Sequence, residues 1–388
     1  METEKKIKVL ISGASVAGLT TAYWLLEYGF NVTIVERAPY IRAGGQALDV
    51  RGPALEVAER MGILEDIHVN STHLNGMIIV DASSGKELSR TTEHTITRGK
   101  HDSPDVEVLR DDLLRVLLKA VGSKAEYIFN DTIVSISSEK EGVDVTFSNA
   151  SAKQFDLVIG ADGLHSNVRK KVFGDEKQYM RYLGHYVAIF TIPNILDLDH
   201  WEVIYQHNDA PVAAYIVKER ESAARVYLGF SNDTPLEYDY HDINIQKRMI
   251  TERTANVGKD IPKILEYMQE SKNFYFDSMN QILMDTWSKG KVTLVGDAGY
   301  SVSVSLGQGT TVAMVGAYVL AGELATHKND LQKGLNSYEV ALRDYVELNQ
   351  KLAYNSNDEI QQESMADPNH IPDFTQSIVP FKLKEYLL

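Results

Sequence analysis

The chain has 388 residues, a formal net charge of -15 and no cysteine. The absence of cysteine excludes disulfides, thiolate catalysis and cysteine-ligated metal sites, and the negative charge disfavours nucleic acid because phosphate binding needs a basic face. There is no apolar run of about 18 residues that could span a bilayer, and no cleavable signal pattern. We expect a two-domain cytoplasmic monomer with no metal site and no nucleic-acid or membrane partner. His68 and His73 are expected to be exposed polar side chains rather than ligands.

The first motif opens the chain. Residues 8–11 predict a buried strand, followed by a Gly-x-Ser-x-x-Gly turn and a helical run over residues 19–26. Ser15 takes the middle position, where a small side chain still permits close approach to a pyrophosphate. A second strand, residues 31–36, ends in an acid placed to bind ribose hydroxyls. Alone, such glycines can be an ordinary tight turn, but with both strands they predict nucleotide binding through Gly13, Ala14, Ser15, Val16, Gly18, Glu36 and Arg37.

Two further segments precede the middle of the chain. Residues 77–80 and the turn after them predict a hairpin, and residues 106–110 predict a strand that leads into a helix over 111–120. Arg110 lies at that strand-to-helix junction. The simplest interpretation of an arginine at this position is a surface ion pair with Asp112.

A second strand-turn-helix unit lies at residues 155–169. It predicts a buried strand that closes on the turn Asp162-Gly163, then a helix with Ser166 as its N-cap. The strand-like segments between residues 172 and 280 then predict an aromatic-rich antiparallel sheet. Such a sheet can hold ordinary cross-strand pairs or cover a flat ligand.

The third unit, residues 292–310, is the most informative. An apolar strand ends at Gly296-Asp297, and the turn Gly307-Gln308-Gly309-Thr310 leads into an apolar helix that we expect to end near residue 326. The acid can accept a hydroxyl proton, and the glycines let backbone N–H groups approach anionic or carbonyl oxygens. Because this unit is far along the chain from the first, a shared ligand must be long, which favours FAD over NAD. A last helix, residues 335–355, places Tyr338, Leu342, Tyr345, Asn349 and Leu352 on one stripe.

With three such units in order, residues 7–325 resemble the single-component FAD-dependent aromatic hydroxylases of the para-hydroxybenzoate hydroxylase type. In that family a Gly-x-Gly-x-x-Gly turn, an Asp-Gly segment and a Gly-Asp segment occur in this order. An arginine in the context of Arg110 reaches the flavin or its pyrophosphate there, a target that suits a guanidinium fork, so the resemblance implies a cofactor role for Arg110. This chain departs from the pattern at Gly299 and Tyr300, where the family has alanine and histidine, and near Val302 and Val304, where it has prolines.

The resemblance implies an α/β fold with three parts. A Rossmann-type FAD-binding domain would comprise residues 1–75, 101–171 and 281–330. An inserted antiparallel β-sheet substrate domain would comprise residues 76–100 and 172–280, and a C-terminal bridging helix and tail would comprise residues 331–388. The extra helix makes the chain look like the tetracycline-inactivating branch of the family.

The resemblance also implies a monooxygenase. NADPH or NADH would reduce FAD transiently, dioxygen would add at the flavin C4a carbon, and the resulting hydroperoxide would give one oxygen atom to an electron-rich aromatic or polycyclic substrate. Because the flavin performs the chemistry, we assign no catalytic residue. Candidate substrate contacts are Gln46, Arg225, Tyr227, Val302 and Ser303, although Arg225 could pair with Glu219 or Glu221 in solvent and Tyr227 could be core.

Other functions remain open at this point. A phenol or polyketide hydroxylase would carry the same motifs, and a flavin-binding regulatory module would bind FAD without turnover of NAD(P)H. A flavin-dependent halogenase would carry a Trp-x-Trp motif, whereas Trp24, Trp201 and Trp287 are isolated. An isoprenoid-lipid reductase or quinone hydroxylase would favour a basic or apolar membrane-facing surface, which the net charge does not suggest.

Overall fold

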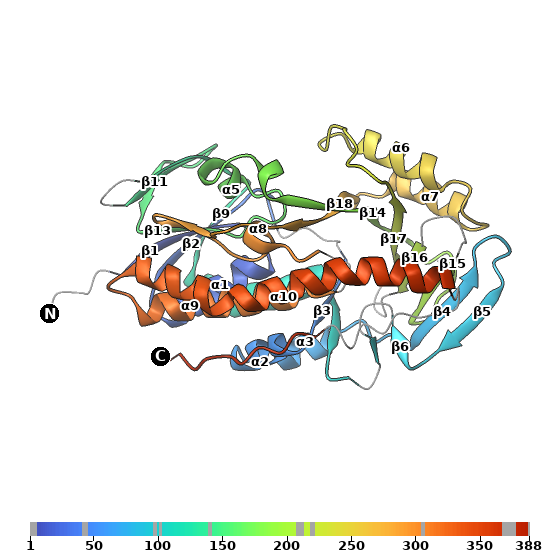
Figure 1. Ribbon diagram of the computed structural model, residues 1–388, viewed down its shortest axis with the longest axis horizontal. Helices are drawn as coiled ribbons and strands as arrows, with labels where there is room; N and C mark the ends of the chain where they lie inside the picture. The colour runs from blue at the N-terminus through green and yellow to red at the C-terminus, as the bar shows by residue number, and fades with distance from the viewer. Residues whose placement is uncertain are drawn as a thin grey trace.

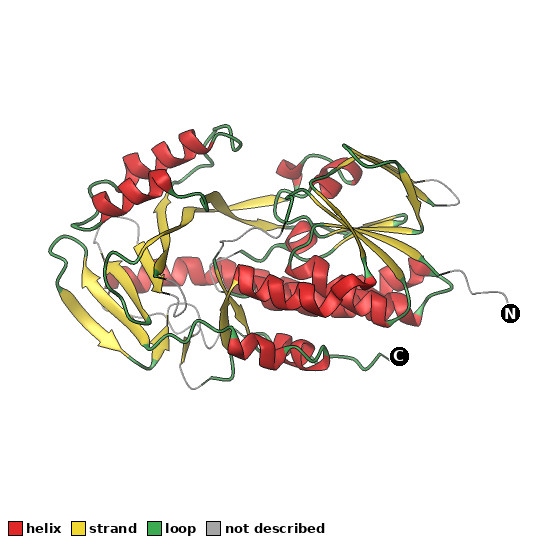
Figure 2. Cartoon of the chain, turned by 180° about the vertical axis from the view of Figure 1, so that it is seen from behind, coloured by secondary structure: helices red, strands yellow, loops and turns green. Residues whose placement is uncertain are grey.

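The computed structural model describes residues 6–40, 46–95, 99–100, 103–138, 142–206, 213–217, 222–303, 307–366 and 378–386. Two sheets organise the molecule (Figures 1 and 2). The first has six strands in the order β19-β20-β13-β1-β2-β9, all parallel except β19. Their bounds are β1 (Lys8–Ser12), β2 (Asn31–Glu36), β9 (Glu126–Phe129), β13 (Leu157–Gly160), β19 (Ser288–Lys289) and β20 (Val292–Leu294).

The central strands of this sheet are buried along almost their whole length. The residues of β13 and β20 are all buried, as are four of the five in β1. Continuous apolar strands are typical of a parallel sheet covered on both faces. The long helices α1 (Val16–Glu27) and α9 (Gly309–Thr326) cover one face, and α4 (Arg110–Val121) packs on α1. A small antiparallel sheet lies on the other side, formed by β10 (Ile133–Ser138), β11 (Val143–Phe147) and β12 (Lys153–Phe155).

The second sheet has seven strands in the order β18-β14-β17-β16-β15-β4-β5. Their bounds are β4 (Gly76–Asp81), β5 (Glu87–Thr91), β14 (Met180–Pro193), β15 (Trp201–Gln206), β16 (Ala213–Val217), β17 (Ala223–Ser231) and β18 (Tyr275–Ile282). The α/β class with an inserted sheet is confirmed, as is the β4–β5 hairpin. One detail differs from the expectation of an antiparallel sheet, because β4 pairs with β15 in parallel. A hairpin forces antiparallel pairing only between consecutive strands, and β4 joins from a distant part of the chain.

A separate hydrophobic cluster supports this second sheet. It includes Tyr186 and Phe190 of β14, Val226 of β17 and residues of the helices α6 (Ile243–Thr254) and α7 (Ile261–Glu270). The division of the chain into the three domains proposed above stays a prediction. Strands β14 and β18 run from the region of the first sheet into the second and so connect the two (Figure 2).

The remaining short elements lie between and beside the sheets. A two-stranded ribbon pairs β3 (Ala47–Val50) with β8 (Val106–Leu109), and a second pairs β6 (His94–Thr95) with β7 (Gly99–Lys100). The short helices are α2 (Pro53–Arg60), α3 (Leu64–Val69), α5 (Asn167–Val172) and α8 (Asp297–Tyr300), with 3₁₀ turns at Gly122–Lys124 and Glu176–Gln178.

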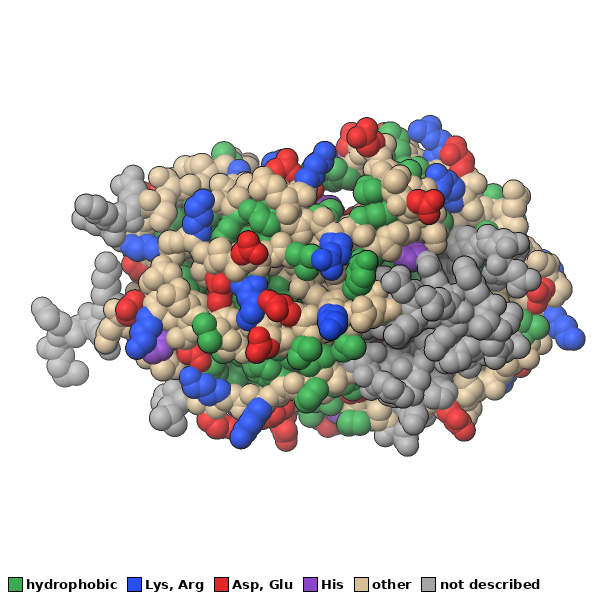
Figure 3. All heavy atoms as spheres, in the orientation of Figure 1, with side chains coloured by type: hydrophobic (Ala, Val, Ile, Leu, Met, Phe, Trp, Pro, Cys, Tyr) green, Lys and Arg blue, Asp and Glu red, His purple; other side chains and the backbone are tan. Residues whose placement is uncertain are grey.

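The last helix, α10 (Leu331–Ala366), has 36 residues and is longer than the sequence pattern predicts. It crosses the molecule from the first sheet to the second (Figure 1), packing on α9 and placing Tyr354 under the Arg181 guanidinium of β14. The predicted stripe faces inward, because Tyr338, Leu342 and Asn349 are buried. On the outer face, acidic and basic side chains are interspersed with small apolar groups over the described residues (Figure 3).

The C-terminal segment 378–386, called here the strap, lies along α9 and α2. Val379 and Leu383 are buried in the core beneath it. The Tyr386 hydroxyl donates to the Glu323 carboxylate at 2.9 Å, and its ring contacts that of Tyr318 edge-on. The strap therefore fastens the chain end to the helix whose N-terminus carries the predicted cofactor turn. Among the described helices, none combines the length and the apolar character that crossing a membrane requires.

We predict that the strap stabilises the fold through its buried side chains. Leu383→Ala should lower the free energy of unfolding by about 2–5 kcal/mol, because it removes a buried side chain and leaves a cavity. Lys382→Ala, at the exposed neighbouring position, is the matched control and should change stability by less than about 0.5 kcal/mol. Denaturant unfolding measures both, and equal stability of the two variants would contradict the prediction.

Candidate functional site

The three predicted cofactor motifs meet at the carboxyl ends of the neighbouring strands β1, β13 and β20. The Ser15 hydroxyl donates to the Ala161 carbonyl at 3.0 Å. A Cβ on Gly13, whose φ is +105°, would lie 2.5 Å from the same oxygen. A Cβ on Gly296 would lie 2.8 Å from the Ala17 side chain. Only glycine permits these approaches, so the motifs form a single site.

The departure at Ser15 has a simple explanation. Its φ is -102°, which any residue adopts, so this position needs a small side chain but not a glycine. Ser15 is the N-cap residue of α1, but no side chain makes a capping hydrogen bond to the first N–H groups of this helix. The first N–H groups of α1 are therefore available to an anion at the positive end of the helix dipole.

Glu36 holds the Gly-x-Ser-x-x-Gly turn against the end of β2. Its two carboxylate oxygens accept hydrogen bonds from the backbone N–H groups of Ala14 at 2.9 Å and Ala38 at 2.8 Å. The adjacent Arg37 is exposed. The geometry leaves the acid half-buried beside the turn, where ribose hydroxyls would reach it.

The carboxylate of Asp162 is used inside the protein. It accepts from the Ser166 hydroxyl and from the backbone N–H of Val168 at 3.1 Å. Ser166 in turn caps α5, as predicted, by accepting from the N–H of Arg169. Burial raises the pKa of Asp162, and these hydrogen bonds oppose the rise. The turn therefore offers a ligand mainly its backbone at Gly163, where φ is +83° and no atom lies within 4 Å of a Cβ.

In contrast to Asp162, Asp297 is exposed to solvent. Enough protein atoms nevertheless lie around its carboxylate to affect its pKa. Burial raises its pKa, and a hydrogen bond with Ser301 lowers it. An accessible carboxylate deep in the structure, at the start of a short helix, suits a hydroxyl group of a bound ligand.

The N-terminus of α9 completes the site. Gly307 has a φ of +64°, and a Cβ there would collide with the Asp49 carboxylate. The Gln308 side chain is 1% exposed, and neither its amide nitrogen nor its amide oxygen has a hydrogen-bond partner among the described residues. No atom lies within 4 Å of a Cβ on Gly309, and no side chain caps the helix. Thr310 is the second residue of α9. Open space beside uncapped N–H groups fits FAD, since flavin carbonyl and phosphate oxygens are acceptors.

Two of the predicted substrate contacts, Gln46 and Tyr227, lie beside the start of β3, together with the predicted cofactor residue Arg110. The Arg110 N–H donates to the Gln46 carbonyl at 3.0 Å, and the Ala47 N–H donates to the Tyr227 hydroxyl. Burial raises the pKa of Tyr227. Arg225 lies 3.9 Å from Asp111 across the boundary between β17 and α4.

One of the simpler alternatives fails on this geometry. Arg225 is only 6% exposed, so it is not a solvated ion pair; Glu219 and Glu221 lie outside the described residues. Asp112 pairs with Arg115 of the same helix, and the choice for Arg110 between a cofactor role and an ion pair with Asp112 stays a prediction. Val302 and Ser303 are buried on the loop before α9, while residues 304–306 and the glycines at 44 and 45 also lie outside the described part.

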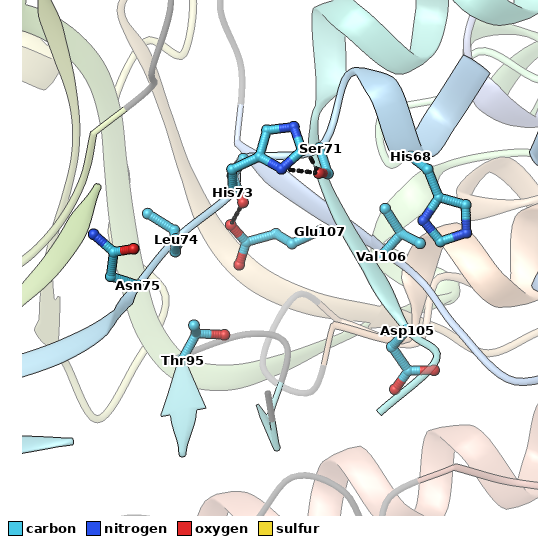
Figure 4. A pocket seen from close by; sticks show the side chains of 10 residues that line it. His68, Ser71, His73, Leu74, Asn75, Thr95, Asp105, Val106 and Glu107 are labelled. Atoms are coloured by element: carbon cyan, nitrogen blue, oxygen red, sulfur yellow. Dashed lines mark hydrogen bonds between the residues drawn. The ribbon is translucent and has the colours of Figure 1, made fainter. Parts of the chain in front are cut away.

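Sequence reasoning missed a cavity of about 260 Å³ next to the β3–β8 ribbon (Figure 4). His68 and His73 lie at its rim, exposed as expected. The buried Glu107 carboxylate lies in its wall and accepts from the Thr72 hydroxyl at 2.7 Å. Glu107 is paired across the ribbon with Asp49, the acid beside Gly307. The cavity therefore adjoins the cofactor turn of α9.

A second missed group surrounds His165, which follows the Asp-Gly turn. One ring nitrogen lies 3.1 Å from Glu176 and the other 3.0 Å from Asp277 of β18. The Tyr275 hydroxyl also donates to Asp277, and the Tyr240 ring stacks on the imidazole. This cluster joins the first sheet's turn to the strand that leads into the second sheet. Its only sequence signal is the histidine next to the turn, since the carboxylates are distant in the chain.

We predict that the His165 cluster makes stability depend on pH. Burial lowers the pKa of His165, but hydrogen bonds to Asp277 and Glu176 outweigh it and raise the pKa from 6.5 to about 10. Because the folded state holds the proton more tightly, the contribution is complete below about pH 6.5 and is lost as pH rises toward 10. The difference in Tm between the wild type and His165→Gln should therefore shrink over that range.

The matched control is His185→Gln, because burial lowers the pKa of His185 and its ring contacts the hydroxyl of Ser231. Its effect on Tm should be constant between pH 7 and 10. A constant difference for the His165 variant as well would contradict the assignment.

We predict that Asp297 retains the flavin. Asp297→Ala should weaken FAD binding by about 10- to 100-fold, the usual range for loss of a hydrogen bond to a charged group. The fluorescence of the flavin that dissociates when the purified protein is diluted measures this loss of affinity. Asp285→Ala, which removes an exposed acid nearby, should retain FAD as the wild type does, and equal retention by both variants would exclude this role for Asp297.

The comparisons with known proteins agree with this site. The family model described as FAD binding domain matches residues 6–352. An uncharacterized protein of Mycobacterium tuberculosis is 49% identical over 344 residues, covering 89% of this chain and 92% of that protein. A flavin-dependent monooxygenase of Legionella longbeachae is 39% identical over 347 residues, with 89% and 88% covered.

The fold extends the agreement to a solved structure. The crystal structure of tetracycline destructase Tet(55) is 34% identical, has a TM-score of 0.84 and covers 98% of this chain and 99% of its own. The family match spans residues 6–352 and so covers the three segments whose turns converge. The chain thus belongs to the family of FAD-binding, flavin-dependent monooxygenases.

Proposed function

We propose that this monooxygenase inactivates tetracyclines, taking its electrons from NADPH or NADH. The observation that carries the proposal is the similarity to tetracycline destructase Tet(55), which extends over 98% of the chain at 34% identity and so includes both sheets and α10. In support, α10 contacts α9 and two strands of the second sheet, as expected of a bridging helix.

The site residues have complementary roles in this proposal. The uncapped N-termini of α1 and α9 would hold FAD phosphate and carbonyl oxygens, and Asp297 would bind a hydroxyl of its ribityl chain. Reduced FAD supplies the activation of dioxygen for transfer of one oxygen atom to an electron-rich ring. The chain itself needs no catalytic triad, and its task is to bind, orient and exclude water.

Substrate binding is assigned to the meeting point of β3, β17 and the loop before α9. Arg225 supplies a buried guanidinium, which suits the oxygens of a polycyclic substrate. Tyr227 contributes a ring and a hydroxyl, and Gln46 lies at the start of β3. With the domain division that we propose, these contacts would lie between the FAD-binding and substrate domains.

The test follows consumption of NADPH and of NADH by the purified yellow protein in aerated buffer, with and without a tetracycline. Loss of the drug's near-ultraviolet chromophore, coupled to nucleotide oxidation and absent in FAD-depleted Asp297→Ala, is the expected result. If nucleotide oxidation does not respond to tetracycline but rises with phenols or polyketides, the tetracycline assignment is wrong and the substrate is a phenol or polyketide. Tight binding of FAD with negligible nucleotide oxidation would indicate a regulatory flavoprotein.

We also propose that the protein is a monomer and that it is cytoplasmic. Gel filtration tests the oligomeric state, and cell fractionation tests the location.

A further inference from the structure

The loop at residues 301–303 connects two parts of the cofactor site. It begins four residues after Asp297 and leads toward the glycine turn of α9. Ser301, Val302 and Ser303 are all at most 6% exposed. Ser303 has a φ of +88°, a conformation that L residues rarely adopt. Such a conformation persists only where its surroundings hold it, and the loop has no proline to restrict its backbone.

Two buried glutamines from distant elements hold this loop. Gln350 of α10 donates its side-chain N–H to the Ser301 carbonyl at 3.2 Å and to the Ile282 carbonyl at 2.8 Å. Gln281 of β18 donates its side-chain N–H to the Val302 carbonyl at 3.3 Å and to the Gln350 carbonyl at 2.7 Å. The two amides therefore connect the last helix, the connecting strand and the loop in one network.

Burial makes this network specific rather than incidental. Gln281 is 0% exposed and Gln350 is 7% exposed. The side-chain oxygen of Gln281 has no hydrogen-bond partner among the described residues, which is unfavourable for a buried amide. An apolar side chain would avoid that cost, so the amide is useful here for its donors. Two of the four carbonyls that these donors reach, those of Ser301 and Val302, belong to a segment that forms neither helix nor sheet, and the Ser301 carbonyl also accepts from the backbone N–H of Ile282 at 3.1 Å.

We propose that Gln281 and Gln350 are positioning residues for the flavin, which they hold in place by fixing the loop 301–303. The network also assigns α10 a role beyond joining the two sheets. Because Gln350 lies on that helix, α10 takes part in placing the loop that follows Asp297 of the cofactor site. The inference depends on FAD binding alone and holds for any substrate.

The test compares three substitutions to methionine in the holoenzyme. Gln281→Met and Gln350→Met remove the donors while keeping a similar length, and methionine is a good helix former. Arg343→Met is the matched control, because Arg343 also reaches from α10 to two backbone carbonyls, those of Met284 and Asp285, neither of which belongs to the loop. The measurements are the FAD dissociation constant, the visible circular dichroism of the bound flavin and the Tm.

Each glutamine variant should weaken FAD binding by about tenfold and change the visible circular dichroism of the flavin. The double variant should lose less FAD binding free energy than the sum of the losses in the two single variants, since both residues act on one loop. Arg343→Met should lower Tm while leaving FAD affinity and the flavin spectrum unchanged.

The proposal is overturned if the glutamine variants bind FAD with wild-type affinity and spectrum, or if Arg343→Met weakens FAD as much for the same loss of Tm. It is also overturned if neither glutamine variant folds while Arg343→Met does, because the amides would then be needed for the core itself. Far-ultraviolet circular dichroism separates that result from loss of flavin.

Discussion

The structure depends on the close approach of two backbone turns, at Gly13 and Ala161, where neighbouring parallel strands end. A side chain at Gly13 would collide with the Ala161 carbonyl, and the Ser15 hydroxyl bonds to that same oxygen. The approach brings the N-terminus of α1 against the Asp-Gly turn, and Gly296 brings the third turn against the same helix. Parallel strands deliver all three turns to one edge. The cofactor site is therefore a consequence of strand order, not of any single motif.

The second sheet is joined to this site through long-range polar contacts as well as through the connecting strands. His165, Asp277 and Glu176 form a charged cluster at one place, and the Gln281 and Gln350 amides form a neutral network at another. Both involve β18, which belongs to the second sheet and runs from the region of the first sheet into it. A monooxygenase that must orient its substrate against a flavin needs such connections, because a small displacement of either part misaligns the reacting atoms.

The arrangement also explains why substrate residues are harder to identify than cofactor residues. The cofactor turns use glycine geometry and helix N-termini, which leave local sequence patterns. The candidate substrate contacts are ordinary residue types, Gln46 before β3 and Arg225 and Tyr227 on β17. They come together only because Tyr227 reaches the β3 backbone. The cavity beside Glu107 has no sequence pattern, since its walls come from α3, β8 and the chain between α3 and β4.

The sequence by itself determined the strand-turn-helix units, their order and the α/β class, because glycine turns, buried strands and helix caps are local. It also indicated α9 and the inward stripe of α10. Only the tertiary structure decided the parallel pairing of β4 with β15, the full length of α10, the use of Asp162 inside the protein and the glutamine network. These features join residues far apart in the chain, and no local propensity encodes which distant carbonyl a buried amide will find.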